Sequence, residues 1–104
     1  MVDKELLELA AKAAGYEYVN WTDHIDDYDT PHYGQPALYG RNQADAWNPL
    51  NDDCDTFHLM VTLSLFGKKI EKRARSLVTE LGLSKLQATR RAVVMYAAEI
   101  GQRK

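Results

Sequence analysis

A proline embedded in polar residues, in the segment 47–53, constrains the fold of this chain more than any other feature. Pro49 fixes its own φ and keeps the preceding Asn48 out of the helical region, so the backbone must be extended up to the proline. Asp52 and Asp53 follow at once, and their carboxylates can accept hydrogen bonds from the first N–H groups of a helix. The sequence therefore predicts that an extended region ends, and a helix begins, within this segment.

Apolar residues at helical spacing predict two further helices, one towards each end of the chain. Residues 4–14, which Asp3 precedes, carry leucines and alanines on one face, and Gly15 follows them as a typical helix terminus. Residues 84–100 begin with Ser84 and, three positions later, Gln87, which is the pattern of a capping box. We expect both segments to be amphipathic helices, the second ending at a break after residue 100.

The helix that begins at Asp53 is expected to continue to residue 66, because Gly67 interrupts it. Its apolar residues cover so wide an arc that we expect a buried central helix, with Leu63 in the core and His58 as a core or boundary residue. The segment 68–81 that follows fits a helix and a strand equally well, and its periodicity leaves both open.

Residues 16–46 differ from the rest of the chain, because tyrosine and tryptophan alternate there with acidic residues and turn formers. This pattern predicts two short strands, residues 16–21 and 36–42, separated by a loop over 22–34 that is long enough for a binding role or disorder. The chain is therefore expected to be α+β, with three helices and a small antiparallel β-sheet in a single domain, residues 1–104.

The composition is that of an ordinary globular domain, with 45% apolar residues. No run approaches the roughly 18 apolar residues that a membrane span needs, and the chain starts without a charged and then apolar leader. The single cysteine, Cys54, excludes an internal disulfide and fits a reducing compartment. We expect a soluble, unexported protein of the cytoplasm with no membrane partner.

The distribution of charge is more informative than the net charge of −2. Residues 1–67 contain three basic and twelve acidic residues, whereas residues 68–104 contain ten basic and three acidic residues. One interpretation is that two halves that pack together neutralise each other; the other is a basic face that binds nucleic acid, a nucleotide or an acidic protein. Arg90 and Arg91 lie beside the apolar stripe of their helix, so we expect them to be open to solvent or a partner. The candidate nucleic-acid-binding residues are Lys68, Lys69, Lys72, Arg73, Arg75, Arg90 and Arg91.

Seven of the eight tyrosine and tryptophan residues lie between positions 16 and 47. Such rings are typical of recognition surfaces, because they combine a large contact area with a polar tip. A chain with only two phenylalanines also needs aromatic residues for its core, so both interpretations stay open. The candidate partner-binding residues, for a protein partner, are Trp21, Tyr28, Tyr33 and Tyr39.

Two clusters contain potential metal ligands. The acidic run 51–55 is explained by helix capping. The other cluster matches neither a closed zinc pattern nor an EF-hand loop. We therefore expect no metal and no cofactor. The residues of this second cluster are His24, Asp26, Asp27, Asp29 and His32.

An enzyme is the least supported function class. General acid–base chemistry would need His24, His32 or His58 beside an aspartate, but no nucleophile with a base at a suitable spacing and no glycine-rich phosphate loop accompanies them. We expect no catalytic residues.

Residues 4–15, 47–55, 88–94 and 97–101 carry a resemblance to a known family. Together they are similar to the phage ABA sandwich family, small proteins of bacteriophages and prophages. The resemblance implies α/β/α layering around a small antiparallel sheet and a virus-encoded origin. It brings no established activity and no catalytic residues.

The chain departs from this family at two places. Cys54 stands where a glycine is usual, and the basic segment 68–83 is shorter than the strand region of relatives. The second departure leaves the assignment of residues 68–81 in doubt, with a slight preference for a strand.

Two function hypotheses follow. The first is a non-enzymatic phage accessory protein that binds a host or defence protein through the aromatic and acidic residues 22–46. The alternative is binding of nucleic acid or a nucleotide by the basic C-terminal half. An aromatic-rich edge strand also makes a homodimer possible.

Overall fold

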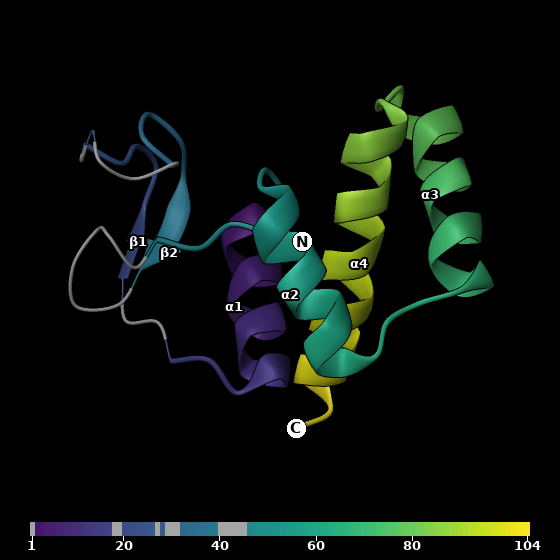
Figure 1. Ribbon diagram of the computed structural model, residues 1–104, viewed down its shortest axis with the longest axis horizontal. Helices are drawn as coiled ribbons and strands as arrows, with labels where there is room; N and C mark the ends of the chain where they lie inside the picture. The colour runs from purple at the N-terminus through teal and green to yellow at the C-terminus, as the bar shows by residue number, and fades with distance from the viewer. Residues whose placement is uncertain (1, 18–19, 27, 29–31, 40–45) are drawn as a thin grey trace.

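The computed structural model describes residues 2–17, 20–26, 28, 32–39 and 46–104. These residues form four helices and two strands, which confirms the α+β class but adds one helix to the three expected. Figure 1 shows the helices gathered on one side of the molecule and the strands on the other. In chain order the elements are α1 (Asp3–Ala14), β1 (Asn20–Thr22), β2 (Ala37–Tyr39), α2 (Asp53–Leu63), α3 (Lys68–Leu81) and α4 (Lys85–Gln102).

Helix α4 is the centre of the helical part, because α1, α2 and α3 all pack against it. It approaches α1 closely at Gly101, where an added Cβ would lie 2.0 Å from the carbonyl oxygen of Leu9 in α1. The glycine expected to break this helix therefore lies inside it and lets two backbones meet. Small residues make up much of the buried face of α4: Ala88, Ala92, Ala97, Ala98 and Gly101.

Several predicted helix boundaries are confirmed by their caps. Asp52 caps α2, since its Oδ1 accepts a hydrogen bond from the N–H of Asp55 at 2.9 Å. Ser84 and Gln87 form the predicted capping box of α4, with both side chain to backbone distances at 3.2 Å. After α1, Gly15 adopts the left-handed φ of 77° that commonly ends a helix.

The undecided segment after Gly67 is the helix α3, so the slight preference for a strand was wrong. Ile70, Ala74 and Leu77 are buried, and their spacings of four and three residues place them on one face of a helix that packs on α4. Lys68, Lys69, Lys72 and Arg75 are exposed, whereas Arg73 is half-buried against α4. The packing of this apolar stripe against α4 therefore decides between helix and strand, a choice that the periodicity of the sequence left open.

Helix α2 corrects two further expectations. It ends at Leu63 rather than residue 66, because Ser64 takes a left-handed φ of 55° and terminates it. It is also not a buried central helix, since only Thr56 and Leu59 among its residues are buried, Leu63 is half-buried and His58 is exposed. The reason is that α2 packs mainly on α4, and within the described residues no element covers its outer face.

The two strands pair antiparallel, with Trp21 opposite Leu38, as predicted. They are shorter than the predicted ranges 16–21 and 36–42, parts of which lie outside the described residues. Trp47 extends the pairing by exchanging two backbone hydrogen bonds with Leu38, at 3.1 and 2.7 Å. The extended approach to Pro49 is thereby tied to the edge of β2.

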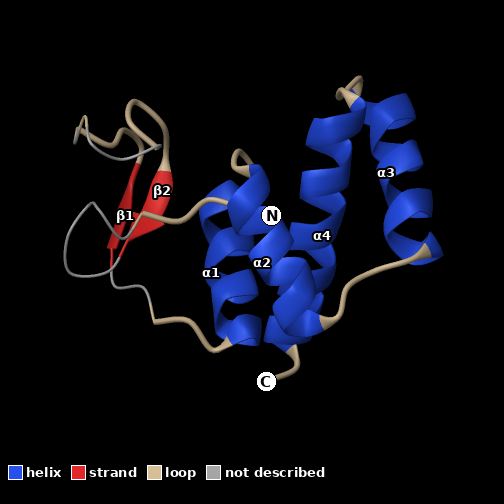
Figure 2. Cartoon of the chain, viewed as in Figure 1, coloured by secondary structure: helices blue, strands red, loops and turns tan. Residues whose placement is uncertain are grey.

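Figure 2 shows all four helices on the same side of β1 and β2. The described residues therefore do not form the α/β/α layering implied by the family resemblance, because two strands of three residues are too narrow to separate layers of helices. None of the described helices is long and apolar enough to cross a membrane.

Candidate functional site

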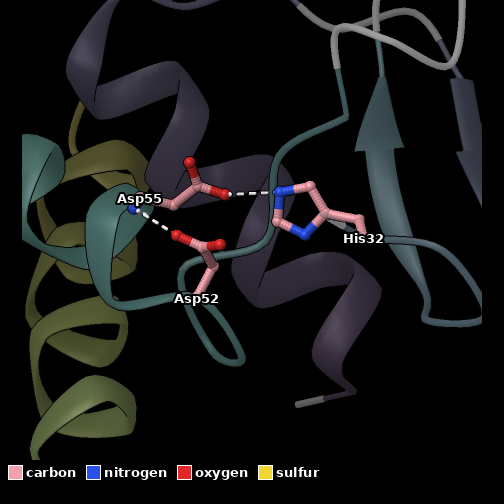
Figure 3. A group of neighbouring side chains, drawn as sticks. All are labelled: His32, Asp52 and Asp55. Carbon is pink, nitrogen blue, oxygen red and sulfur yellow. Dashed lines mark hydrogen bonds and ion pairs between the residues drawn. The ribbon is translucent and has the colours of Figure 1, made fainter. Parts of the chain in front are cut away.

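A buried histidine joins the loop between the two strands to the start of α2 (Figure 3). His32 is only 3% exposed, and its Nε2 lies 3.1 Å from Oδ2 of Asp55. Asp55 belongs to the first turn of α2, where its own N–H donates to the N-cap residue Asp52. We call His32, Asp52 and Asp55 the His32 clasp. The cap that starts α2 thus also orients the carboxylate that meets His32.

The carboxylate of Asp55 holds the extended segment before α2 as well. Its Oδ2 accepts a hydrogen bond from the N–H of Asn48 at 2.9 Å. The buried side chain of Asn48 donates through Nδ2 to the carbonyl oxygen of Pro36 at 2.7 Å, and its Oδ1 accepts from the N–H of Leu50 at 2.9 Å. The segment 47–53 therefore connects the hairpin to α2 through side-chain and backbone hydrogen bonds.

The His32 clasp changes the titration of its imidazole. The hydrogen bond with Asp55 raises the pKa of His32 above its usual value of 6.5; burial acts against this, and the charges of Asp55 and Asp52 add to it. The imidazole is therefore protonated more readily than in the unfolded chain. The clasp is an ion pair while that proton is bound.

The three side chains of the clasp also offer metal-ligand atoms within 4.8 Å of one another. Both carboxylates, however, already accept hydrogen bonds from backbone N–H groups, and Asp55 meets His32 directly. A metal ion would have to compete with all of these contacts. The arrangement therefore fits an ion pair that joins two parts of the chain better than a metal centre.

Beside His32, the loop exposes two stacked tyrosine rings. The ring centroids of Tyr28 and Tyr33 lie 4.3 Å apart with their planes 23° from parallel. Tyr28 is 80% exposed and Tyr33 is 42% exposed. The ring of His24 meets Tyr33 edge-on at 6.0 Å. These rings form an aromatic face that is open to a partner.

Backbone hydrogen bonds hold the segment that carries Tyr33. Ile25 is fully buried, and its N–H and carbonyl oxygen bond to Gln35 at 3.0 Å and to Gly34 at 2.8 Å. Tyr33 is therefore flanked by the buried His32 on one side and by a hydrogen-bonded glycine on the other. The ring of Tyr33 therefore stands on an anchored segment of the loop.

Carboxylates accompany the rings. The side chain of Asp26 is 82% exposed, and its Oδ1 lies 3.1 Å from Nδ1 of His24. A hydrogen bond with Tyr28 raises the pKa of Tyr33, with smaller contributions from desolvation and from Asp26, so its phenol stays neutral near pH 7. Flat ring faces next to a carboxylate suit a cationic group. We call His24, Asp26, Tyr28 and Tyr33 the aromatic–acidic surface.

The other two predicted partner-binding residues lie in the strands. Trp21 in β1 and Tyr39 in β2 are half-buried, and Nε1 of Trp21 donates to Asp23 at 2.9 Å. Farther inside, Trp47 is 4% exposed and packs edge-on against Tyr16 at 5.6 Å. Some aromatic residues of the region 16–47 therefore lie in the core, whereas others are exposed at the surface.

The predicted basic face is largely engaged within the chain. Arg90 donates to the carbonyl oxygen of Leu50 at 2.9 Å and pairs with Asp53 at 2.8 Å, and Arg91 pairs with Asp3 at 3.1 Å. Both arginines are half-buried, so the expectation that they are open to a partner was wrong. These ion pairs join the basic C-terminal half of the chain to its acidic N-terminal half, as expected if the two halves neutralise each other's charge.

The remaining predicted cations all belong to α3. Arg73 pairs with Glu99 at 2.8 Å and lies 3.9 Å above the ring of Tyr96, and Arg75 pairs with Glu71 at 2.5 Å. The three lysines of the set are exposed near the start of α3, with no ion pair among the described residues: Lys68, Lys69 and Lys72.

The three histidines considered for catalysis are in different surroundings. His32 is buried beside Asp55, His24 pairs with Asp26 at the surface, and His58 is exposed on α2. The described contacts bring no two of these imidazoles together.

The link between His32 and Asp55 was missed at the level of sequence. Both residues were noted, but in separate clusters that lie far apart along the chain. In the structure His32 from one cluster contacts Asp55 from the other. Asp27 and Asp29 lie outside the described residues. To join the two clusters, one would have to know that His32 is buried. The residues around His32 in the sequence form no pattern that indicates this burial.

No protein-family model, curated protein or solved structure matches this chain.

Proposed function

We propose that this protein binds a basic segment, rich in arginine or lysine, of a partner protein through the aromatic–acidic surface. The observation that carries the proposal is the stacked and exposed pair of Tyr28 and Tyr33, which stands beside the carboxylate of Asp26. Exposed rings at this density are unusual on a surface without a partner.

The chemistry of the surface supports a cationic ligand. A guanidinium or ammonium group can lie over a tyrosine ring while it also pairs with a carboxylate. The buried His32 and Ile25 hold the segment that carries Tyr33, so this ring loses fewer conformations when a partner docks. A preorganised site of this kind needs less contact area than a flexible loop would.

A bacteriophage or prophage origin is part of the proposal. It rests on the similarity of residues 4–15, 47–55, 88–94 and 97–101 to the phage ABA sandwich family. In that setting the partner would be a host or defence protein in the cytoplasm of the infected bacterium. The protein would act by occupying that partner rather than by catalysis.

Nucleic-acid binding by the basic half has less support. Each of the four arginines in the candidate nucleic-acid-binding set pairs with a carboxylate, which leaves Lys68, Lys69 and Lys72 as the members of that set without such a pair among the described residues. Three lysines at the start of one helix offer few phosphate contacts.

The direct experiment is a titration of a fluorescein-labelled octa-arginine peptide, followed by anisotropy. Replacing Tyr28 and Tyr33 by leucine keeps the net charge and should weaken binding about tenfold. Phe57→Leu, which removes an exposed ring from α2, is the matched control and should bind like the wild type. Equal affinity of the wild type and the tyrosine variant would refute the proposal, because attraction between net charges would then explain all binding.

A further inference from the structure

An apolar groove runs between α2 and α3. Both helices pack on α4, yet they form no extensive contact with each other, and Figure 1 shows α4 between them. The groove has a volume of about 750 Å³. Met60 of α2 forms one wall, Ile70, Ala74 and Val78 of α3 form the other, and Thr89 of α4 lines the groove between them. The charged residues Glu71, Arg75 and Lys85 also line the groove.

An apolar ridge stands beside this groove. Phe57 and Val61 of α2 and Phe66, which follows that helix, are 59%, 52% and 57% exposed. Phe57 and Val61 lie one turn apart, on the helix face next to the groove residue Met60. No lysine, arginine, aspartate or glutamate occurs from residue 56 to residue 67. Depletion of charge around exposed aromatic residues is the composition of an interface centre.

We propose that the groove is filled by the ridge of a second copy of this chain, in a two-fold symmetric dimer. A two-fold interface uses the same patch on both subunits, so that patch must be complementary to itself. This chain carries a convex apolar ridge and a concave apolar groove side by side on α2 and α3. Each copy can therefore insert its ridge into the groove of the other.

Charge complementarity favours a second copy as the occupant. Antiparallel packing of the two α2 helices brings the first turn of one, with the exposed Asp53 that also pairs with Arg90 of its own chain, towards the start of α3 in the other. That start carries Lys68 and Lys69, which are exposed and form no ion pair among the described residues. Opposite charges thus meet at both ends of the apolar contact.

The exposed apolar area is of the size that a modest dimer requires. The ridge and the exposed side chain of the groove residue Val78 together present about 400 Å² of apolar surface. An interface of standard size buries about 800 Å² per subunit, of which somewhat more than half is apolar. We therefore expect a dimer that dissociates at micromolar rather than nanomolar concentration.

The test is sedimentation equilibrium of the full chain from 5 to 500 µM. The wild type should pass from the monomer mass of 11.8 kDa to twice that value. A ridge variant, Phe57→Ser with Val61→Ser, should dimerise at least about 30-fold more weakly. The groove variant Val78→Glu should do the same without any change to the ridge.

Mixing the two variants sharpens the test. The ridge variant retains its groove and the groove variant retains its ridge, so a mixture should regain one of the two contacts and form a weak heterodimer that neither variant forms with itself. Val2→Ser, an exposed apolar residue that lines a different pocket, is the control and should dimerise normally. Helical circular dichroism should be unchanged in every variant.

Two results would overturn the inference. One is a wild type that stays monomeric up to 500 µM. The other is a dimer that survives the ridge and groove variants but is lost in Tyr33→Ser, which would move the interface to the hairpin. A wild type that stays monomeric leaves octa-arginine binding by the aromatic–acidic surface unaffected, so the dimer can fail while the proposed function stands. A dimer lost in Tyr33→Ser would instead place the interface on that surface.

Discussion

Nε2 of His32 lies 3.1 Å from Oδ2 of Asp55, and the same oxygen accepts the N–H of Asn48 at 2.9 Å. One carboxylate therefore connects three segments: the loop between the strands, the extended approach to α2, and the first turn of α2 itself. Stability and presentation of the aromatic–acidic surface both depend on this contact.

Replacing His32 by glutamine should destabilise the protein in a pH-dependent way. The pKa of His32 is raised in the folded state, so the stabilisation from its proton is fully present below about pH 6.5 and is lost as pH rises through the folded pKa. The variant should lose about 1–3 kcal/mol of unfolding free energy at pH 6. Urea denaturation at pH 6 and pH 9 measures the difference, which should be smaller at pH 9.

The cause of that shift can be tested separately. In Asp55→Asn the charge and the strongest hydrogen-bond acceptor of His32 are lost, so NMR titration of the His32 ring should show a lower pKa than in the wild type. An unchanged titration midpoint would mean that Asp55 does not hold this proton.

Gly101→Ala should destabilise the protein, although alanine is the better helix former. A Cβ at this position would lie 2.0 Å from the carbonyl oxygen of Leu9, so α1 and α4 would have to separate. We expect a loss of about 1–3 kcal/mol in thermal or urea unfolding. Gln102→Ala, at the next and exposed position, is the control and should have little effect. A gain in stability for Gly101→Ala would contradict the close crossing.

Leu59→Ala and Leu63→Ala distinguish the observed burial of α2 from the one expected. Leu59 is fully buried, so its truncation should cost about 2–5 kcal/mol. Leu63 is half-buried and should cost clearly less. The opposite order in chemical denaturation would restore the buried central helix predicted from sequence.

Sequence reasoning succeeded where the signal is local. Pro49, the N-cap Asp52 and the Ser84 capping box act within a few residues of themselves, so their consequences could be read directly. The α+β class and the pairing of β1 with β2 followed from alternating and helical apolar patterns.

It failed where the outcome depends on distant packing. The helical state of α3 is decided by Ile70 and Leu77 against α4, and the exposure of Phe57 depends on which elements leave α2 uncovered. The pairing of His32 with Asp55 spans 23 positions and has no local pattern. Likewise, Arg90 and Arg91 look available on a helical wheel but meet carboxylates from α2 and α1.

The central claim, recognition of a basic segment by Tyr28 and Tyr33, is tested most directly by a ¹H–¹⁵N NMR titration of the labelled chain with octa-arginine. We predict that the largest shift changes fall on residues 23–35, around the aromatic–acidic surface, and disappear when both tyrosines are replaced by leucine. Shift changes spread evenly over the exposed acidic residues, and unaltered in that variant, would contradict the account.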